Sequence, residues 1–161
     1  MALASLANAG ISVFIAGESS KVQGAENTLL FEFLRSEVTA ANTTIVISGL
    51  TKTQTPTTAD LPVYKGSDGS EVPSGDVEGG KGAWDQALGK LTLTLSNEVA
   101  AGKLGRFRIK LKNSAIENPG VKPTLEILAD DKVSDGENIL TANEAGQAAV
   151  TTTKSATTTT S

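Results

Sequence analysis

Apolar and polar residues alternate with a period of two along several short stretches of this chain, which predicts β-strands rather than helices. The clearest stretch is residues 90–97 (KLTLTLSN), where leucines share one face and threonines the other. Residues 106–113 (RFRIKLKN) repeat the pattern, with apolar residues on one face and four cations on the other. With residues 123–129 (PTLEILA), they predict three consecutive strands, the first two paired as an antiparallel hairpin.

Shorter runs of β-branched and aromatic residues predict the remaining strands. These strands lie at residues 11–16, 28–35, 43–49 and 146–153, with an edge strand at 61–64 and a brief strand at 139–140. Residues 50–82 hold three of the five prolines and six of the sixteen glycines, so we expect a long loop there. We therefore predict an all-β, antiparallel, immunoglobulin-like β-sandwich of about seven to nine strands with one long loop.

The length of 161 residues fits one domain with a tail. We assign residues 1–153 to a single sandwich domain and residues 154–161, which are rich in threonine and serine, to a tail or linker. Such a segment has too little apolar surface to order itself.

Composition then narrows the classes of function. The chain has no cysteine and no histidine, which excludes Ser-His-Asp and Cys-His nucleophilic sites, zinc fingers and histidine-bound metals. A net charge of −4 argues against nucleic acid as a partner, because binding to phosphates requires a basic surface. No run of about 18 apolar residues occurs, so we expect no membrane span.

Five motifs follow one another in an order that resembles a known kind of module. They are residues 44–51 (TIVISGLT), Thr55-Pro56 with Leu61-Pro62-Val63, Trp84 before residues 91–95 (LTLTL), Ala101-Gly102 before residues 107–113 (FRIKLKN), and residues 123–127 (PTLEI). Together they resemble the β-sandwich repeat modules of large secreted surface proteins of algae and other protists, over roughly residues 28–129. The chain departs from that pattern where Asn113 is followed by Ser114 instead of proline, and where outward positions carry arginine and lysine instead of serine and threonine.

The resemblance implies an extracellular or cell-surface structural or adhesive module without catalysis and without a cofactor. Its implied partners are copies of itself or neighbouring repeat modules. The departures suggest a surface adapted to one partner, such as a neighbour in a filament or lattice.

The cations of residues 106–113 are the first candidate for a binding surface. Arg106, Arg108, Lys110 and Lys112 share one face of their strand. Because same-face neighbours lie about 6.6 Å apart, four like charges repel one another unless anions are near. The anions are either carboxylates of this chain, such as Glu32 or Glu126, or those of an anionic glycan or an acidic partner. Internal pairing is the more common arrangement, since exposed ion pairs are frequent.

An acidic segment at residues 130–138 is a weak candidate for calcium, which prefers carboxylate oxygens. Its carboxylates are Asp130, Asp131, Asp135 and Glu137, and Asp68, Asp76 and Glu78 form a weaker set in the long loop. The spacing departs from the EF-hand loop at its third and twelfth positions, which hold Val133 and Ala142. A solvated turn is the simpler interpretation.

Trp84 and Tyr64 are candidates for stacking on sugar rings, although a lone tryptophan more often closes one end of a core. Asn42-Thr43-Thr44 is an N-glycosylation sequon, which matters only in a secreted protein.

Three functional hypotheses remain. We favour a non-catalytic structural module or self-assembling subunit of an extracellular surface layer or filament. The alternatives are a carbohydrate-binding or adhesion domain and a viral coat or fibre subunit. We do not expect an enzyme.

Overall fold

The fold is described by a computed structural model that covers residues 11–65, 74–128, 131–133 and 138–144. The strand expected at residues 146–153, the tail at 154–161 and the domain boundary between them lie outside these described residues.

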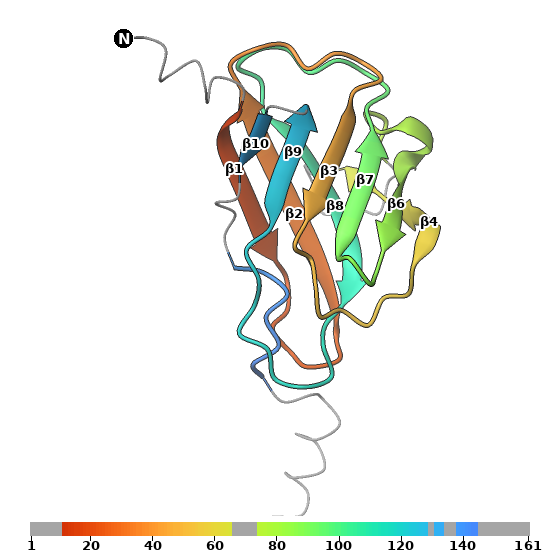
Figure 1. Ribbon diagram of the computed structural model, residues 1–161, viewed down its shortest axis with the longest axis vertical. Helices are drawn as coiled ribbons and strands as arrows, with labels where there is room; N and C mark the ends of the chain where they lie inside the picture. Colours follow the sequence, from red (N-terminus) through yellow and green to blue (C-terminus); the bar gives the residue numbers. More distant parts are fainter. Residues whose placement is uncertain (1–10, 66–73, 129–130, 134–137, 145–161) are drawn as a thin grey trace, which may run out of the picture.

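Ten strands and one short 3-10 turn, Glu78–Gly80, make up the described chain (Figure 1). The strands are β1 Ile11–Glu18, β2 Glu26–Arg35, β3 Thr44–Ser48, β4 Thr58–Pro62, β5 Tyr64–Lys65, β6 Lys81–Asp85, β7 Lys90–Thr94, β8 Gly105–Lys112, β9 Thr124–Leu128 and β10 Asp131–Val133. They form a four-stranded sheet in the order β1-β2-β8-β5 and a six-stranded sheet in the order β10-β9-β3-β7-β6-β4. All pairings between these strands are antiparallel. The immunoglobulin-like β-sandwich predicted from the sequence is confirmed.

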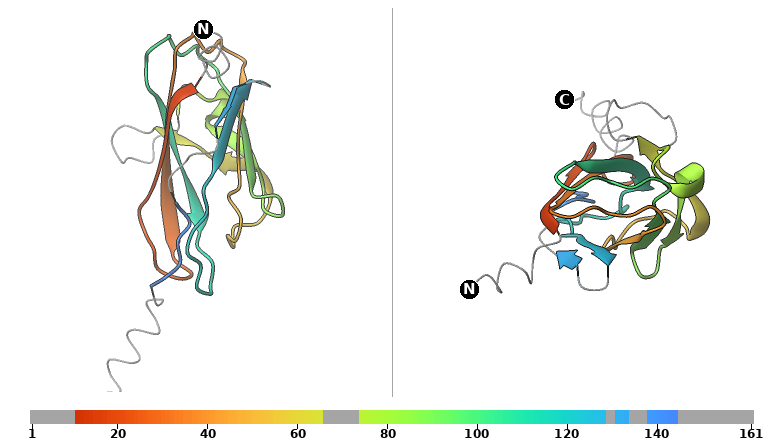
Figure 2. Two further views of the ribbon diagram at one scale, coloured as in Figure 1. Left: turned by 60° about the vertical axis from the view of Figure 1, so that its left-hand side comes forward. Right: turned by 90° about the horizontal axis from the view of Figure 1, so that it is seen from above.

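The two sheets lie face to face and enclose one core (Figure 2, left). Alternate residues of the facing strands point inward, as the period of two requires. In the four-stranded sheet, Phe31 of β2 pairs with Phe107 of β8, and their ring centroids are 5.6 Å apart. Ile45 of β3 and Leu91 of β7 are fully buried on the facing sheet and belong to the same cluster.

The prediction of a hairpin between residues 90–97 and 106–113 is wrong. These residues form β7, which lies between β3 and β6, and β8, which lies between β2 and β5 in the other sheet. Residues 95–104 cross from one sheet to the other. Alternation tells which face of a strand is apolar but not which strand is its neighbour, and neighbours in sequence pair in only about two-thirds of cases.

Three shorter elements also differ from expectation. The edge strand expected at residues 61–64 is two strands, β4 and β5, which belong to different sheets. No strand was expected at residues 81–85, the first two of which were assigned to the long loop, yet they form β6, which pairs with both β4 and β7. The acidic segment expected to be a turn contains the three-residue strand β10, paired with β9.

One end of the sandwich, here called the loop end, is closed by two connections of the same form, residues 36–43 and 96–103. Thr39 and Val99 exchange two backbone hydrogen bonds of 2.8 Å. The amide of Asn42 donates to the carbonyl of Leu95, and the amide of Gly102 donates to that of Arg35, at 2.8 and 2.9 Å.

Asn42 and Gly102 occupy equivalent positions of the loop end, with φ of 70° and 74°. Both connections begin with a serine and carry two alanines immediately before this position, in the sequences SEVTAAN and SNEVAAG. The two connections that cross between the sheets are therefore joined by a reciprocal set of backbone hydrogen bonds.

The opposite end, here called the amide end, is closed by side chains. Asn27, at the start of β2, and Asn113, just after β8, are both fully buried and joined by a hydrogen bond of 2.9 Å. Asn118, in the loop that follows Asn113, is also buried and donates to the carbonyl of Leu140 at 3.0 Å. The amide end is thus built around polar groups that water does not reach.

The described chain starts at one end of the sandwich and finishes at the other. Ile11 pairs with Arg35 at the loop end. Glu144 lies at the amide end, where its amide donates to the carbonyl of Lys21 at 3.0 Å. Figure 1 shows the start of β1 near the upper end of the sandwich and the blue segment of residues 138–144 at the lower end.

Within the described ranges, the structure contains no helix with the length and apolar character that a membrane crossing requires.

Candidate functional site

The basic ladder, defined as Arg106, Arg108, Lys110 and Lys112, lies along β8 on the outer face of the four-stranded sheet. At one end of the ladder, Arg106 and Glu32 are cross-strand neighbours, and Arg106 Nη2 lies 2.8 Å from Glu32 Oε2. Of the two carboxylates expected to neutralise the ladder, Glu32 does so. The expectation for Glu126 is wrong, because β9 lies in the other sheet.

The two middle cations are also engaged within the fold. Arg108 is only 9% exposed, and its Nε donates to the carbonyl of Lys65 at 2.7 Å. The ammonium of Lys110 lies 5.6 Å from the centroid of the Tyr64 ring and 3.8 Å from a carboxylate oxygen of Glu26. A cation over an aromatic face is held by the ring's electrostatic field.

These contacts change what the basic ladder offers to a partner. Lys112 is exposed, whereas Arg108 is buried under the edge that β5 forms. Tyr64 is half-buried with one side of its ring occupied by Lys110. Three of its four cations, Arg106, Arg108 and Lys110, are therefore engaged by groups of this chain.

Trp84 lies in the core. It is 1% exposed, and its indole nitrogen donates to the carbonyl of Thr55 at 2.9 Å. The ring packs under β4 and β6 and leaves no free face on which a sugar could stack.

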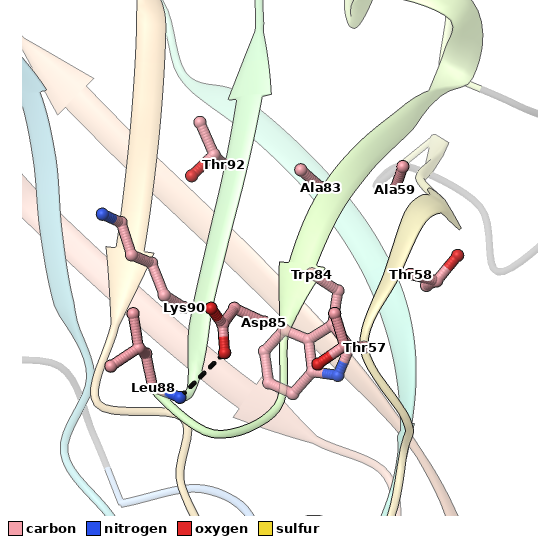
Figure 3. Close-up of a pocket in the computed structure, with 9 residues that line it drawn as sticks. All are labelled: Thr57, Thr58, Ala59, Ala83, Trp84, Asp85, Leu88, Lys90 and Thr92. Atoms are coloured by element: carbon pink, nitrogen blue, oxygen red, sulfur yellow. Dashed lines mark hydrogen bonds between the residues drawn. The ribbon is translucent and has the colours of Figure 1, made fainter.

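A shallow groove of about 380 Å³ lies over Trp84 on the outside of the six-stranded sheet (Figure 3). Its lining includes Thr57, Asp85, Leu88 and Lys90. The Asp85 carboxylate accepts a hydrogen bond of 3.0 Å from the amide of Leu88, which closes the β6–β7 turn. The groove thus combines a hydroxyl, a carboxylate, an ammonium and an apolar side chain, a set that suits a polar ligand with hydroxyl groups.

The calcium candidates fall mostly outside the described residues. Asp130, Asp135 and Glu137 lie there, as does Asp68 of the weaker set. Asp131 opens β10, and Asp76 accepts a hydrogen bond of 3.2 Å from the side chain of Asn97. Within the described part of the chain, no three carboxylates gather in a way that would hold a metal ion.

Asn42 lies at the tip of the loop end. Its side chain is exposed, and its backbone adopts the left-handed conformation noted above. Asparagine tolerates that conformation better than most residues, which explains its presence in this turn. The sequon is sterically accessible.

One exposed ion pair stands apart from these sites. Lys81 Nζ lies 2.6 Å from Asp60 Oδ1, joining the edge strand β4 to β6. The hydrogen bond to Asp60, and secondarily its charge, raise the pKa of Lys81. The pair caps an edge of the six-stranded sheet with charges, a common way to discourage pairing with another chain.

The amide end was not foreseen as a site. The side-chain oxygen of Asn27 accepts from the amides of Ser19 and Ser20 at 3.0 and 3.1 Å, and its nitrogen donates to Glu18 Oε1 at 3.0 Å. Together with the bond to Asn113, this uses every hydrogen-bonding position of Asn27.

Asn113 completes the network by binding the first loop of the chain. Its side-chain nitrogen donates to the carbonyls of Ser20 and Val22 at 3.1 and 2.9 Å. Both asparagines continue an inward-facing apolar series, Asn27 before Leu29 and Asn113 after Leu111. A polar residue at the end of such a series is the signal from which the network could have been found.

Comparisons with known proteins identify neither a family nor a function for this chain. No family model and no curated protein matches this chain. A crystal structure of an uncharacterized protein from Nocardia farcinica with an immunoglobulin-like fold aligns over 81% of this chain and 94% of its own, at 14% identity and a TM-score of 0.48. An inactive mutant of a GH20 exo-β-N-acetylglucosaminidase from Vibrio harveyi aligns over 81% of this chain and 18% of its own, at 13% identity and a TM-score of 0.45. Likenesses this remote concern the fold alone.

Proposed function

We propose that this protein is a non-catalytic structural module of an extracellular surface layer or filament. The observation that carries the proposal is the path of the described residues, which runs from Ile11 at the loop end to Glu144 at the amide end. A module traversed in this way can be joined in series to others without the chain turning back. Its partners are neighbouring modules or further copies of itself.

The state of the basic ladder supports the same proposal. A surface built to capture a soluble anion would keep its cations available, whereas Arg106, Arg108 and Lys110 contact groups of this chain. Those contacts tie β8 to β2 and β5 and so stiffen the outer face of the sheet. The resemblance of residues 28–129 to surface-protein repeats points in the same direction.

Small-angle X-ray scattering on one copy and on two copies fused in series tests the proposal. If the modules are strung end to end, the maximum dimension of the fused pair should approach twice that of the single copy. A fused pair whose maximum dimension barely exceeds that of one copy would overturn the serial arrangement.

Self-assembly is a separate part of the proposal and needs its own measurement. Light scattering and negative-stain imaging over a concentration series should show regular oligomers or fibres if single copies polymerise. A strict monomer at high concentration would eliminate the self-assembling subunit and leave the serial module intact.

The Asn42 sequon supports an extracellular location only if it can carry a glycan, and this can be tested. Expression through a eukaryotic secretory pathway should add the mass of a glycan to the chain, and Asn42→Gln should abolish the addition. Asn97→Gln, at an exposed asparagine of the same end outside any sequon, is the matched control. A secreted protein without added mass removes the sequon from the case for secretion.

A carbohydrate-binding function is the second candidate, and the groove over Trp84 favours it. We expect such binding to use the hydroxyl of Thr57 and the charges of Asp85 and Lys90, since Trp84 itself is buried. Sedimentation with insoluble cellulose, chitin and alginate gel would reveal it. Binding that survives Lys90→Ala as well as it survives Lys103→Ala, at an exposed lysine of the loop end, would exclude the groove.

A further inference from the structure

We infer that the molecule resists tension along its long axis and that residues 138–144, here called the exit segment, are the element that yields first. The inference rests on the proposed function, because a module joined in series transmits force through its two ends. Tension on such a module separates Ile11 at the loop end from Glu144 at the amide end.

The exit segment is held from two sides by backbone hydrogen bonds. On one side, Ile139 and Val121 exchange bonds of 2.9 and 2.8 Å, and Ala142 and Asn118 exchange bonds of 2.8 and 2.9 Å. These ladders are antiparallel.

On the other side, the exit segment is held by the loop that follows β1. The amides of Asn143 and Glu144 both donate to the carbonyl of Lys21, at 3.1 and 3.0 Å, and the amide of Gln23 donates to the carbonyl of Glu144 at 2.8 Å. Val22 and Glu144 form a parallel bridge. The last residues of the segment therefore run parallel to the loop around Val22.

Side chains pass the load into the centre of the four-stranded sheet. Glu18 Oε1 accepts from the amide of Thr141 at 3.0 Å and from Asn27 Nδ2 at 3.0 Å. Asn27 in turn binds Asn113, so the exit segment is connected to β2 and β8 through the half-buried Glu18 and these two buried asparagines.

Apolar side chains anchor the same segment. Ile139 and Leu140 are both 0% exposed and belong to the core cluster. Leu140 adopts a left-handed backbone conformation with φ 59°, which is unfavourable for leucine and is held by the surrounding contacts. Withdrawing the exit segment would therefore remove two apolar side chains from the core.

The direction of pull decides how these bonds fail. Ladder hydrogen bonds lie perpendicular to their strands, so tension along the exit segment strains them together instead of opening them one after another. β1 is strained in the same way against β2, but over the longer register from Ile11 to Glu18. The shorter exit segment should separate first, while the central sheets are still intact.

Single-molecule pulling tests this order of events. The chain has no cysteine, so Ser12→Cys and Asn143→Cys provide unique handles at exposed positions near the two ends. In that background, Ile139→Val removes one methylene from the exit segment, and Ile47→Val makes the identical change at an equally buried position of β3. Urea unfolding of both variants supplies the equilibrium loss with which each mechanical effect is compared.

The two variants should differ under force although they are similar in urea. Forced unfolding follows the unfolding rate, and that rate rises when the altered contact is already broken at the transition state. We expect Ile139→Val to unfold roughly two- to tenfold faster at constant force, the range that an Ile→Val change permits. We expect less than about a twofold change for Ile47→Val.

An equal or larger acceleration by Ile47→Val would overturn the inference, because the central sheet would then open no later than the exit segment. That result would leave the proposed function untouched, since the scattering of fused pairs tests the serial arrangement independently. Conversely, a compact fused pair would overturn the serial arrangement without changing the order in which the elements yield.

Discussion

The two ends of the sandwich solve the same problem in different ways. Each must satisfy backbone groups where chains leave the sheets. At the loop end, residues 36–43 and 96–103 satisfy each other mainly by backbone hydrogen bonds, with exposed alanines at the tips. The buried guanidinium of Arg35 adds hydrogen bonds of 2.9 and 3.0 Å to the carbonyl of Val38 and the hydroxyl of Thr39. At the amide end, the buried side chains of Asn27, Asn113 and Asn118 do so.

The difference shows where each end is sensitive. Backbone bonds survive most side-chain changes, so the loop end depends on conformation and space at a few positions. When a buried asparagine is replaced, the hydrogen bonds of its side-chain amide are lost, so the stability of the amide end depends on residue identity. The expected losses of stability follow this order.

The largest effect should come from Asn113→Ala at the amide end. The change leaves the carbonyls of Ser20 and Val22 and one donor of Asn27 buried without their partner. Since each such group costs about 1–3 kcal/mol, we expect a total of about 3 kcal/mol or more in the free energy of unfolding in urea. Asn143→Ala, at an exposed asparagine of the same end, should change it by less than about 0.5 kcal/mol. Similar losses in the free energy of unfolding for the two variants would show that the amide end does not depend on its buried side chains.

A smaller effect is expected from Gly105→Ala at the loop end, where space is the constraint. A Cβ at this position would lie 2.5 Å from the Phe33 ring. Overpacking of this kind costs about 1–3 kcal/mol, measured as a lower urea midpoint at unchanged slope. Gly17→Ala in β1, where a Cβ meets nothing within 4 Å, should be neutral or stabilising. The packing explanation fails if both alanines behave alike.

At Gly102 and Asn42, the effect of a substitution on stability should depend on backbone conformation alone. Nothing lies within 4 Å of a Cβ at Gly102, so Gly102→Ala should cost about 1 kcal/mol through its φ of 74°. Because asparagine tolerates this region, Gly102→Asn should cost less, and Asn42→Gly should be close to neutral. Thermal unfolding of the three variants gives the ranking. Any other order would mean that the two turns are not equivalent.

The smallest effect is expected away from both ends, at the exposed pair Asp60–Lys81. Such pairs contribute little to stability, and Asp60→Asn should lower the melting temperature only slightly at pH 7. The pKa of Lys81 is raised in the folded state, so the contribution is complete below the unfolded pKa of about 10.4 and is lost as pH rises through the folded pKa. The difference between the two proteins should therefore vanish in alkaline solution and shrink in 1 M salt. A difference that persists there would point to an origin other than the ion pair.

The faces of the strands were predictable from the sequence, whereas the partners of the strands were not. In residues 106–113 the alternation identified Phe107, Ile109 and Leu111 as core residues, and all three are buried. Nothing in that pattern tells that β8 pairs with β2 instead of β7. The partner depends on residues 95–104 crossing between the sheets, which is a property of the whole sandwich.

β6 shows how composition can obscure a pattern. Gly82 and Trp84 face inward and alternate with Lys81, Ala83 and Asp85, as in other strands. The glycine-rich surroundings favoured a loop. In the structure the missing side chain of Gly82 provides room for Leu91, because a Cβ there would lie 2.9 Å from Leu91 Cδ1.

The candidate sites were predictable by residue type but not by environment. The sequence identified the basic ladder, yet the burial of Arg108 and the contact of Lys110 with Tyr64 depend on β5. The expected edge strand ended at Tyr64, and the pairing of this residue with β8 was not predicted. Glu18, Asn27 and Asn113 are far apart in the chain, and only the fold brings them together.

The reciprocal loops have a consequence for the time the chain needs to fold. β2 and β8 are neighbours in one sheet, but the chain between them builds β3 and β7 of the other, so neither sheet can be completed before its counterpart has begun. Proteins dominated by such distant pairings fold in milliseconds to seconds, against microseconds for chains with local contacts. We therefore expect single-exponential refolding on that slower timescale, and a stretched module should regain its resistance only after a pause of the same length.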